Sequence, residues 1–257
     1  MNKLLMKGAM LFPLLLFGAC SSFSPEVLTG EQSLGKEWDV VLMDGKAVVP
    51  ADDTPYLGFD KEKMWGFTGC NRLTGGFPVK DNKKVDFSKL ASTMMMCPDS
   101  KYETDFMAAL RQVKSIDSAK DGFRLKNEAG KTVLEFAPRE LTDERLGGEW
   151  MITLNKGTDG YKQDGEKPFV GFDIKEKRIY GFAGCNRLVG TLNFEEFKSG
   201  KADFSQLGTT RMLCEDNTYE QALLENLAKA KKVKFFNNEL RLFDGNNETL
   251  VILRKSK

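Results

Sequence analysis

The most constraining feature of this sequence is an internal repeat. The segment GFTGCNRLTG at residues 66–75 recurs as GFAGCNRLVG at residues 181–190. Further along, DFSKLASTMMMC at residues 86–97 recurs as DFSQLGTTRMLC at residues 203–214. The matches keep the same order in both copies, which indicates one unit of roughly 110 residues written twice. A unit of this length can bury a core of its own, so the chain can fold as two domains.

Matching tryptophans place the domain limits. Trp38 lies in LGKEW near the start of the first copy, and Trp150 lies in LGGEW near the start of the second. We therefore expect domains at residues 34–137 and 146–257, with a linker at 138–145. Each domain is expected to fold by itself.

The N-terminus has the composition of an export signal. Lys3 and Lys7 precede the apolar run LFPLLLFGA, which is too short to span a bilayer and is followed by Cys20. The small residues Gly18 and Ala19 before Cys20 resemble the lipobox of bacterial lipoproteins. This resemblance implies a signal peptide at residues 1–19, cleavage before Cys20, lipid on its sulfur and a polar tether at residues 20–33.

Composition excludes several classes of function. The chain carries 38 Lys and Arg against 37 Asp and Glu, with no basic run, so the electrostatic signature of a nucleic-acid-binding protein is missing. It contains no His, which rules out Ser-His-Asp and Cys-His nucleophiles and imidazole ligands for zinc.

Four cysteines remain once Cys20 is assigned to the lipid. Cys70 and Cys97 lie in the first copy, and Cys185 and Cys214 lie at matching places in the second. Two cysteines per repeat in an exported chain favour one disulfide within each copy, among three pairings that are formally open. A zinc site or a redox-active pair would require closer spacings such as C-x-x-C.

The hydrophobic pattern of each copy predicts an antiparallel β-rich unit with one helix. Apolar stretches around charged turns are typical of β-hairpins, for example in PYLGFDKEKMWGFTG, which starts at Pro55, and in ELRLFDGNNETLVIL, which starts at Glu239. Apolar residues then recur at helical spacing, predicting helices near 101–114 and 218–231. The fold class is therefore α+β, with a curled sheet or partial barrel in each copy.

Capping motifs support the starts of both helices. Ser100 and Glu103 fit a capping box, and Asn217 and Glu220 occupy the matching places in the second copy. In Thr93-x-Met95-x-Cys97, alternation in an extended strand would direct Met95 into the core and leave Met94 and Met96 outside.

Taken together, these motifs resemble the META domain family, also called HslJ-like. The resemblance rests on LxGxW, GCNRxxG and TxMxC leading into a capped helix, each present twice. It implies a small β-rich fold with one helix and an envelope or secreted setting, often as a lipoprotein, with links to stress in some members. It implies no catalytic residues, cofactor or metal.

The candidate site residues are those of the repeated GCNR turn, Asn71, Arg72, Asn186 and Arg187. Asn and Arg at a tight turn could bind an anionic group. Alternatively Asn provides the turn conformation, and Arg pairs with Asp86 or Asp203 or covers the C-terminal carbonyls of the helix, in which case removing the arginine should destabilise its domain. A calcium loop over residues 155–166 resembles an EF-hand only in part and lacks flanking helices, so no metal is expected.

The sequence thus predicts a non-enzymatic, lipid-anchored protein of the bacterial cell envelope, on the outer membrane or the periplasmic face. Its two domains would serve binding or stress protection. An alternative is an interaction module that docks on an envelope protein complex through an exposed sheet edge. A carboxylate- or metal-dependent hydrolase is a further alternative, although no acid pair is shared by the two copies.

The lipid anchor generates the first testable prediction. Cys20→Ala should release the protein from membranes, because the acyl chains are the anchor that the sequence provides. Sedimentation of membranes at high salt, followed by immunoblotting, measures this. A variant that still sediments with the membranes would show a different attachment.

Overall fold

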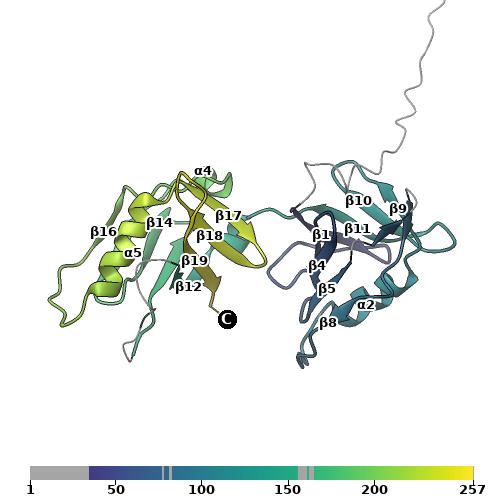
Figure 1. Ribbon diagram of the computed structural model, residues 1–257, viewed down its shortest axis with the longest axis horizontal. Helices are drawn as coiled ribbons and strands as arrows, with labels where there is room; N and C mark the ends of the chain where they lie inside the picture. Colours follow the sequence, from purple (N-terminus) through teal and green to yellow (C-terminus); the bar gives the residue numbers. More distant parts are fainter. Residues whose placement is uncertain (1–34, 77, 81–82, 156–160, 162–164, 257) are drawn as a thin grey trace, which may run out of the picture.

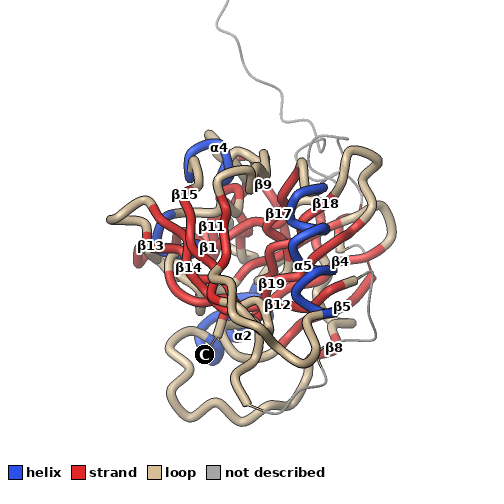
Figure 2. Tube along the Cα trace, turned by 90° about the vertical axis from the view of Figure 1, so that its left-hand side faces the viewer, coloured by secondary structure: helices blue, strands red, loops and turns tan. Residues whose placement is uncertain are grey.

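The computed structural model describes residues 35–76, 78–80, 83–155, 161 and 165–256. Within this part the chain forms two β-rich domains that lie side by side, the first coloured purple to teal and the second green to yellow in Figure 1. A view at right angles shows how strands dominate both domains (Figure 2).

The first domain is one antiparallel sheet that curls around a helix. Its strands run in the order β6-β7-β9-β10-β11-β1-β3-β4-β5-β8, with β2 paired to β1. The elements are β1 (Glu37–Met43), β2 (Lys46–Ala47), β3 (Tyr56–Phe59), β4 (Lys63–Phe67), β5 (Arg72–Gly76), β6 (Val79–Lys80), β7 (Lys84–Val85), β8 (Ala91–Ser92), α2 (Glu103–Gln112), β9 (Ser115–Ser118), β10 (Phe123–Lys126) and β11 (Thr132–Pro138).

The second domain repeats this topology. Its sheet has the order β16-β15-β14-β13-β12-β19-β18-β17, which matches the first sheet strand for strand once β2, β6 and β7 are set aside. The elements are α3 (Asp143–Leu146), β12 (Gly148–Leu154), β13 (Phe169–Asp173), β14 (Arg178–Phe182), β15 (Arg187–Thr191), α4 (Phe194–Lys198), β16 (Leu207–Thr209), α5 (Thr218–Lys229), β17 (Lys232–Phe236), β18 (Glu239–Phe243) and β19 (Thr249–Lys255).

Each domain has a separate hydrophobic core. One cluster of buried apolar side chains runs from Trp38 to Phe136, and the other runs from Leu141 to Leu253. The main helix of each domain contributes the apolar stripe that the sequence predicts, with Phe106 and Leu110 buried in α2 and Leu223 and Leu227 buried in α5. The predicted fold class of two β-rich units with one main helix each is confirmed.

The cysteines pair within each copy. Cys70 is bonded to Cys97 and Cys185 to Cys214, as the even distribution of cysteines over the repeat predicts. Each bridge joins the GCNR turn to the segment that leads into the main helix. By the loop-closure account, a bridge over a loop of this length stabilises its domain by roughly 3 kcal/mol.

The first helix start keeps one half of its predicted capping box, and the second start keeps neither half. Ser100 Oγ accepts a hydrogen bond from Glu103 N at 3.3 Å, but the carboxylate of Glu103 turns away from the helix end. Asn217 makes no capping hydrogen bond, and Asp216 accepts from Thr218 N at 2.9 Å instead. The two glutamates have another partner, described below.

Candidate functional site

The GCNR turn of the first domain is organised around the buried side chain of Asn71. Its Nδ2 donates to Glu103 Oε1 at 2.8 Å and to the main-chain oxygen of Met95 at 3.2 Å. Its Oδ1 accepts from Thr93 Oγ1 and from Met95 N, both at 2.7 Å. One carboxamide therefore joins the turn, the segment after β8 and the start of α2.

Asn186 makes the same contacts in the second domain. Its Nδ2 donates to Glu220 Oε1 at 3.0 Å, and its Oδ1 accepts from Thr210 Oγ1 at 2.8 Å and from Met212 N at 2.7 Å. The glutamates that resemble capping-box residues therefore hold these asparagines in place. We call the Asn71–Glu103 and Asn186–Glu220 arrangements the asparagine clasps.

The two clasps differ at one position. In the first domain the hydroxyl of Thr68 accepts from Asn71 N at 2.8 Å and donates to Glu103 Oε1 at 3.0 Å. Ala183 occupies the matching place in the second domain, and there Asn186 N donates directly to Glu220 Oε2 at 2.5 Å. Both versions satisfy the main-chain N–H, as a buried donor requires.

The arginines of the GCNR turns lie at the surface and make different contacts. Arg72 donates to Asn237 Oδ1 of the second domain, whereas Arg187 forms an ion pair with Glu166 at 2.7 Å. The expected pairing with Asp86 or Asp203 is therefore wrong. The asparagine, which needs a buried partner for each of its polar atoms, carries the structural role in the turn.

The methionine segments are also exposed. Met94 and Met96 are almost fully accessible, and Met95 is 54% exposed, so the expectation that Met95 fills the core is wrong. Met212 and Leu213 protrude in the same way from the second domain. Paired strand β8 ends at Ser92, so the segment beyond it has no second layer to cover its side chains.

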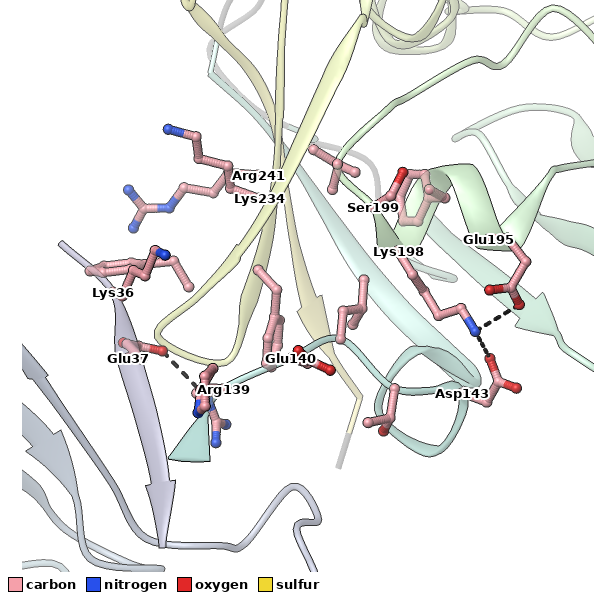
Figure 3. Close-up of a pocket in the computed structure, with 18 of the residues that line it drawn as sticks. Lys36, Glu37, Arg139, Glu140, Asp143, Glu195, Lys198, Ser199, Lys234 and Arg241 are labelled. Atoms are coloured by element: carbon pink, nitrogen blue, oxygen red, sulfur yellow. Dashed lines mark hydrogen bonds and ion pairs between the residues drawn. The ribbon is translucent and has the colours of Figure 1, made fainter. Parts of the chain in front are cut away.

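A groove of about 1400 Å³ lies between the two domains. Figure 3 shows how it is built: Lys36, Lys234 and Arg241 gather on one side, while Lys198 on the opposite side is paired with Asp143 and Glu195. Aromatic side chains of the second sheet line it between the charged residues, namely Phe235, Phe236 and Phe243.

Strand β17, which lines this groove, is the last strand of its sheet. Near its start, Val233 N donates to Gly200 O at 2.9 Å, which covers that part of the edge. Alternation along the strand directs the main chain of Phe235 to the same outer edge. In the described chain no main-chain group pairs with it there.

The wall between the domains contains a cluster of four buried charges. Arg139 contacts both Asp39 and Glu37, and Arg145 donates to Asp39 Oδ2 at 2.6 Å. Both arginine side chains are 1% exposed. Two positive and two negative groups balance, so burial leaves no net charge in the wall. We call this set the interdomain charge cluster.

The tip of the β17–β18 hairpin closes this wall from the second domain, as the yellow ribbon in Figure 3 shows. Asn237 and Asn238 form its turn with φ of 57° and 59°, a left-handed conformation that asparagine tolerates well. Asn237 N donates to the carboxylate of Glu37 at 3.1 Å, and Tyr56 Oη donates to Asn237 Oδ1 at 3.1 Å. The ring of Phe236 packs on Trp65 with centroids 5.5 Å apart.

Burial shifts the pKa values of this wall. Desolvation raises the pKa of Glu37, although hydrogen bonds from Trp65 and from the main chain of Asn237 and the charge of Arg139 act in the opposite direction. Desolvation also lowers the pKa of Arg139 and raises that of Tyr56. The cost of burying these groups is therefore only partly offset by their partners.

Other predicted site residues fall outside the described chain. Cys20, the signal peptide and the tether lie there, and so do residues 156–160 and 162–164 of the calcium-like loop. In the part of the chain that the structure describes, no three metal-binding side chains converge. No helix among the described residues is long and apolar enough to cross a bilayer.

The duplicated curled sheet, with a main helix, an internal disulfide and an asparagine clasp in each copy, defines a tandem of small β-rich domains. The sequence profile of the META domain matches residues 31–140 and 141–257, so the chain belongs to the META domain family. No curated protein and no solved structure matches the chain.

The asparagine clasps generate a prediction that separates the two residues of each turn. Asn71→Ala and Asn186→Ala should each destabilise the protein by about 2 kcal/mol, because a carboxylate, a threonine hydroxyl and a main-chain N–H each lose a partner in the clasp. Arg72→Ala and Arg187→Ala serve as matched controls and should leave the melting temperature nearly unchanged. Thermal melts of the four variants decide this, and equal losses for arginine and asparagine would contradict it.

Glu37 generates a prediction on pH. Because its pKa is raised in the folded protein, its contribution to the free energy of unfolding is greatest below its ordinary value of 4.5 and is lost as pH rises through the folded value. Glu37→Gln can keep Oε1 as the acceptor for Trp65 and Asn237 but does not ionise. Urea titrations of both proteins from acid to neutral pH should show the variant gaining stability relative to wild type, and a difference that does not vary with pH would contradict this.

Proposed function

We propose that this protein is a non-enzymatic binding module of the bacterial cell envelope, anchored by lipid at Cys20, that holds a polypeptide segment of a partner between its two domains. The observation that carries the proposal is the groove with the open edge of β17 along its side. A free strand edge offers main-chain hydrogen bonds to any extended segment, and the residues around it select among segments.

The lining of the groove indicates the chemistry of that segment. Lys36 and Lys234 are exposed, and in the described chain neither has a carboxylate within ion-pair distance. The guanidinium of Arg241 lies 5.7 Å from the ring of Phe236, so apolar and cationic surfaces alternate along this side. An extended segment that alternates acidic and aromatic side chains would complement both.

The other functions that the sequence suggests differ in how well they agree with a peptide-binding groove. Holding exposed segments of other proteins is a form of stress protection, and docking on an envelope complex would use the same sheet edge. A carboxylate- or metal-dependent hydrolase has less support, because Glu103 and Glu220 are engaged by the buried side chains of Asn71 and Asn186 in the clasps.

Peptide binding tests the proposal. A pool of extended peptides that alternate Glu with Phe or Tyr should bind the soluble chain and slow hydrogen exchange at the Phe235 amide. Reversing both free cations, with Lys36→Glu and Lys234→Glu, should weaken binding about tenfold or more at low salt, and added salt should reduce the difference.

Lys46→Glu provides the matched control, since Lys46 is exposed on β2 outside the groove lining. It should leave both peptide affinity and exchange at Phe235 unchanged. Binding that is equally sensitive to all three lysines, or that leaves the Phe235 amide unprotected, would contradict the proposal.

A further inference from the structure

The sheet face that receives the hairpin tip in the first domain is built from a row of three residues on adjacent strands. Glu37 on β1 lies opposite Gly58 on β3, and Gly58 lies opposite Trp65 on β4. The ring of Trp65 lies on Gly58, where a Cβ would come within 2.3 Å of ring atoms. The indole Nε1 donates to Glu37 Oε1 at 2.9 Å, which orients the carboxylate toward the hairpin.

The second domain carries the same row. Glu149 on β12 lies opposite Gly171 on β13, and Gly171 lies opposite Tyr180 on β14. The ring of Tyr180 lies on Gly171 in the same way, with a Cβ again coming within 2.3 Å of ring atoms. Its hydroxyl reaches Glu149 Oε1 at 3.5 Å. Glycine is needed at both positions, because any side chain would displace the ring.

The remaining members of the face also correspond. Phe169 stands at the place of Tyr56, and Arg187 stands at the place of Arg72. The second domain thus presents an acid, two aromatic rings and an arginine at the places that contact Phe236 and Asn237 in the first domain, although Arg187 is paired with Glu166 and Phe169 lacks the hydroxyl of Tyr56. We call this set the second-domain face.

The two faces differ in what covers them. In the first domain Glu37 is 6% exposed and Tyr56 is fully buried beneath the hairpin tip. In the second domain Glu149 is exposed, and Phe169 and Tyr180 are half-buried. No turn from elsewhere in the described residues contacts Glu149 or Tyr180 as Asn237 contacts Glu37.

We propose that the second-domain face is a docking site for a β-turn of another protein. The contacts that the first domain makes with its own hairpin tip indicate the chemistry of this turn. An aromatic side chain before the turn would pack on Tyr180, and a main-chain N–H within the turn would donate to Glu149. A carboxamide or carbonyl oxygen of the turn would accept from Arg187 in place of Glu166, its partner in the unoccupied face.

A second copy of this chain does not offer such a turn. In each copy the Asn237–Asn238 turn is already bound by the first domain. The hairpin of the first domain that corresponds to β17–β18 is β9–β10, and its turn at Ala119–Gly122 lacks the paired asparagines. The occupant is therefore a different polypeptide.

The second-domain face is suited to reversible binding. Met151 and Ser256 replace Asp39 and Arg139, since Ser256 N donates to Glu149 O just as Arg139 N donates to Glu37 O, both at 2.9 Å. Docking there buries no counterpart of the Asp39–Arg139 pair. The turn bound by the first domain belongs to the same chain, whereas an occupant of the second-domain face can exchange.

A cyclised peptide with the sequence of residues 232–243 is the probe. Added to the full soluble chain, it should bind saturably with one site per chain, as measured by fluorescence anisotropy. Glu149→Arg changes an exposed residue, so the fold is kept, and it should weaken binding at least tenfold. Tyr180→Ala should do the same, and replacing the phenylalanine at the Phe236 position of the peptide by alanine should abolish binding.

The groove variants Lys36→Glu and Lys234→Glu separate this site from the proposed function and should leave binding of the cyclised peptide unchanged. Absence of saturable binding would overturn the inference. Affinity that is unaffected by Glu149→Arg, or that depends on Trp65 of the first domain instead, would overturn it as well.

Discussion

The arrangement of the two domains depends on one interaction, the contact of Arg139 and Arg145 with Asp39. These side chains are withdrawn from water at the junction of the domains, where removing one partner would leave an uncompensated buried charge at a cost of about 3–5 kcal/mol. Arg145 also donates to the main-chain oxygen of Ala51 at 3.0 Å, so the segment that enters the second domain is fixed to a loop of the first. The orientation of the hairpin tip, the open edge of β17 and the walls of the groove all follow from this junction.

Within each domain, the corresponding constraint is the asparagine clasp. A single buried carboxamide satisfies a glutamate from the main helix, a threonine hydroxyl and the main chain of the methionine segment, and the adjacent disulfide holds the same two segments covalently. The most strongly repeated motif of the sequence therefore belongs to the structural framework. The residues that distinguish the two copies, such as Asp39 against Met151, are those that give the copies different roles.

The repeat made much of the fold predictable. The disulfides, the main helices and the hairpins were predictable because each depends on a pattern that one sequence shows. These patterns are two Cys per copy, apolar residues at helical spacing, and apolar runs on either side of a turn. The role of Asn71 was not separable from that of Arg72, because both lie in one turn and only burial distinguishes them. The alternation of side chains along a strand wrongly predicted that Met95 is buried. Its segment extends past the last paired residue of β8, where no second layer covers the side chains.

The interdomain charge cluster was missed for a different reason. Its members are far apart in the sequence, and Asn237 and Glu37, which meet across the junction, are 200 residues apart. A signal was nevertheless present: Asp39 and Arg139 are charged at positions where the second copy has Met151 and Ser256. A charge at a strand position that the other copy leaves uncharged indicates a contact that only one copy makes.

The interdomain charge cluster and the hairpin tip would join the two META domains into one rigid body. Nuclear spin relaxation of main-chain ¹⁵N in the soluble chain tests it most directly, because it reports the rotational diffusion of each domain separately. A single diffusion tensor should fit the amides of both domains, and the amides of Asn237 and Asn238 should be as rigid as those of the strands. Two tensors with different correlation times, or a mobile hairpin tip, would contradict it.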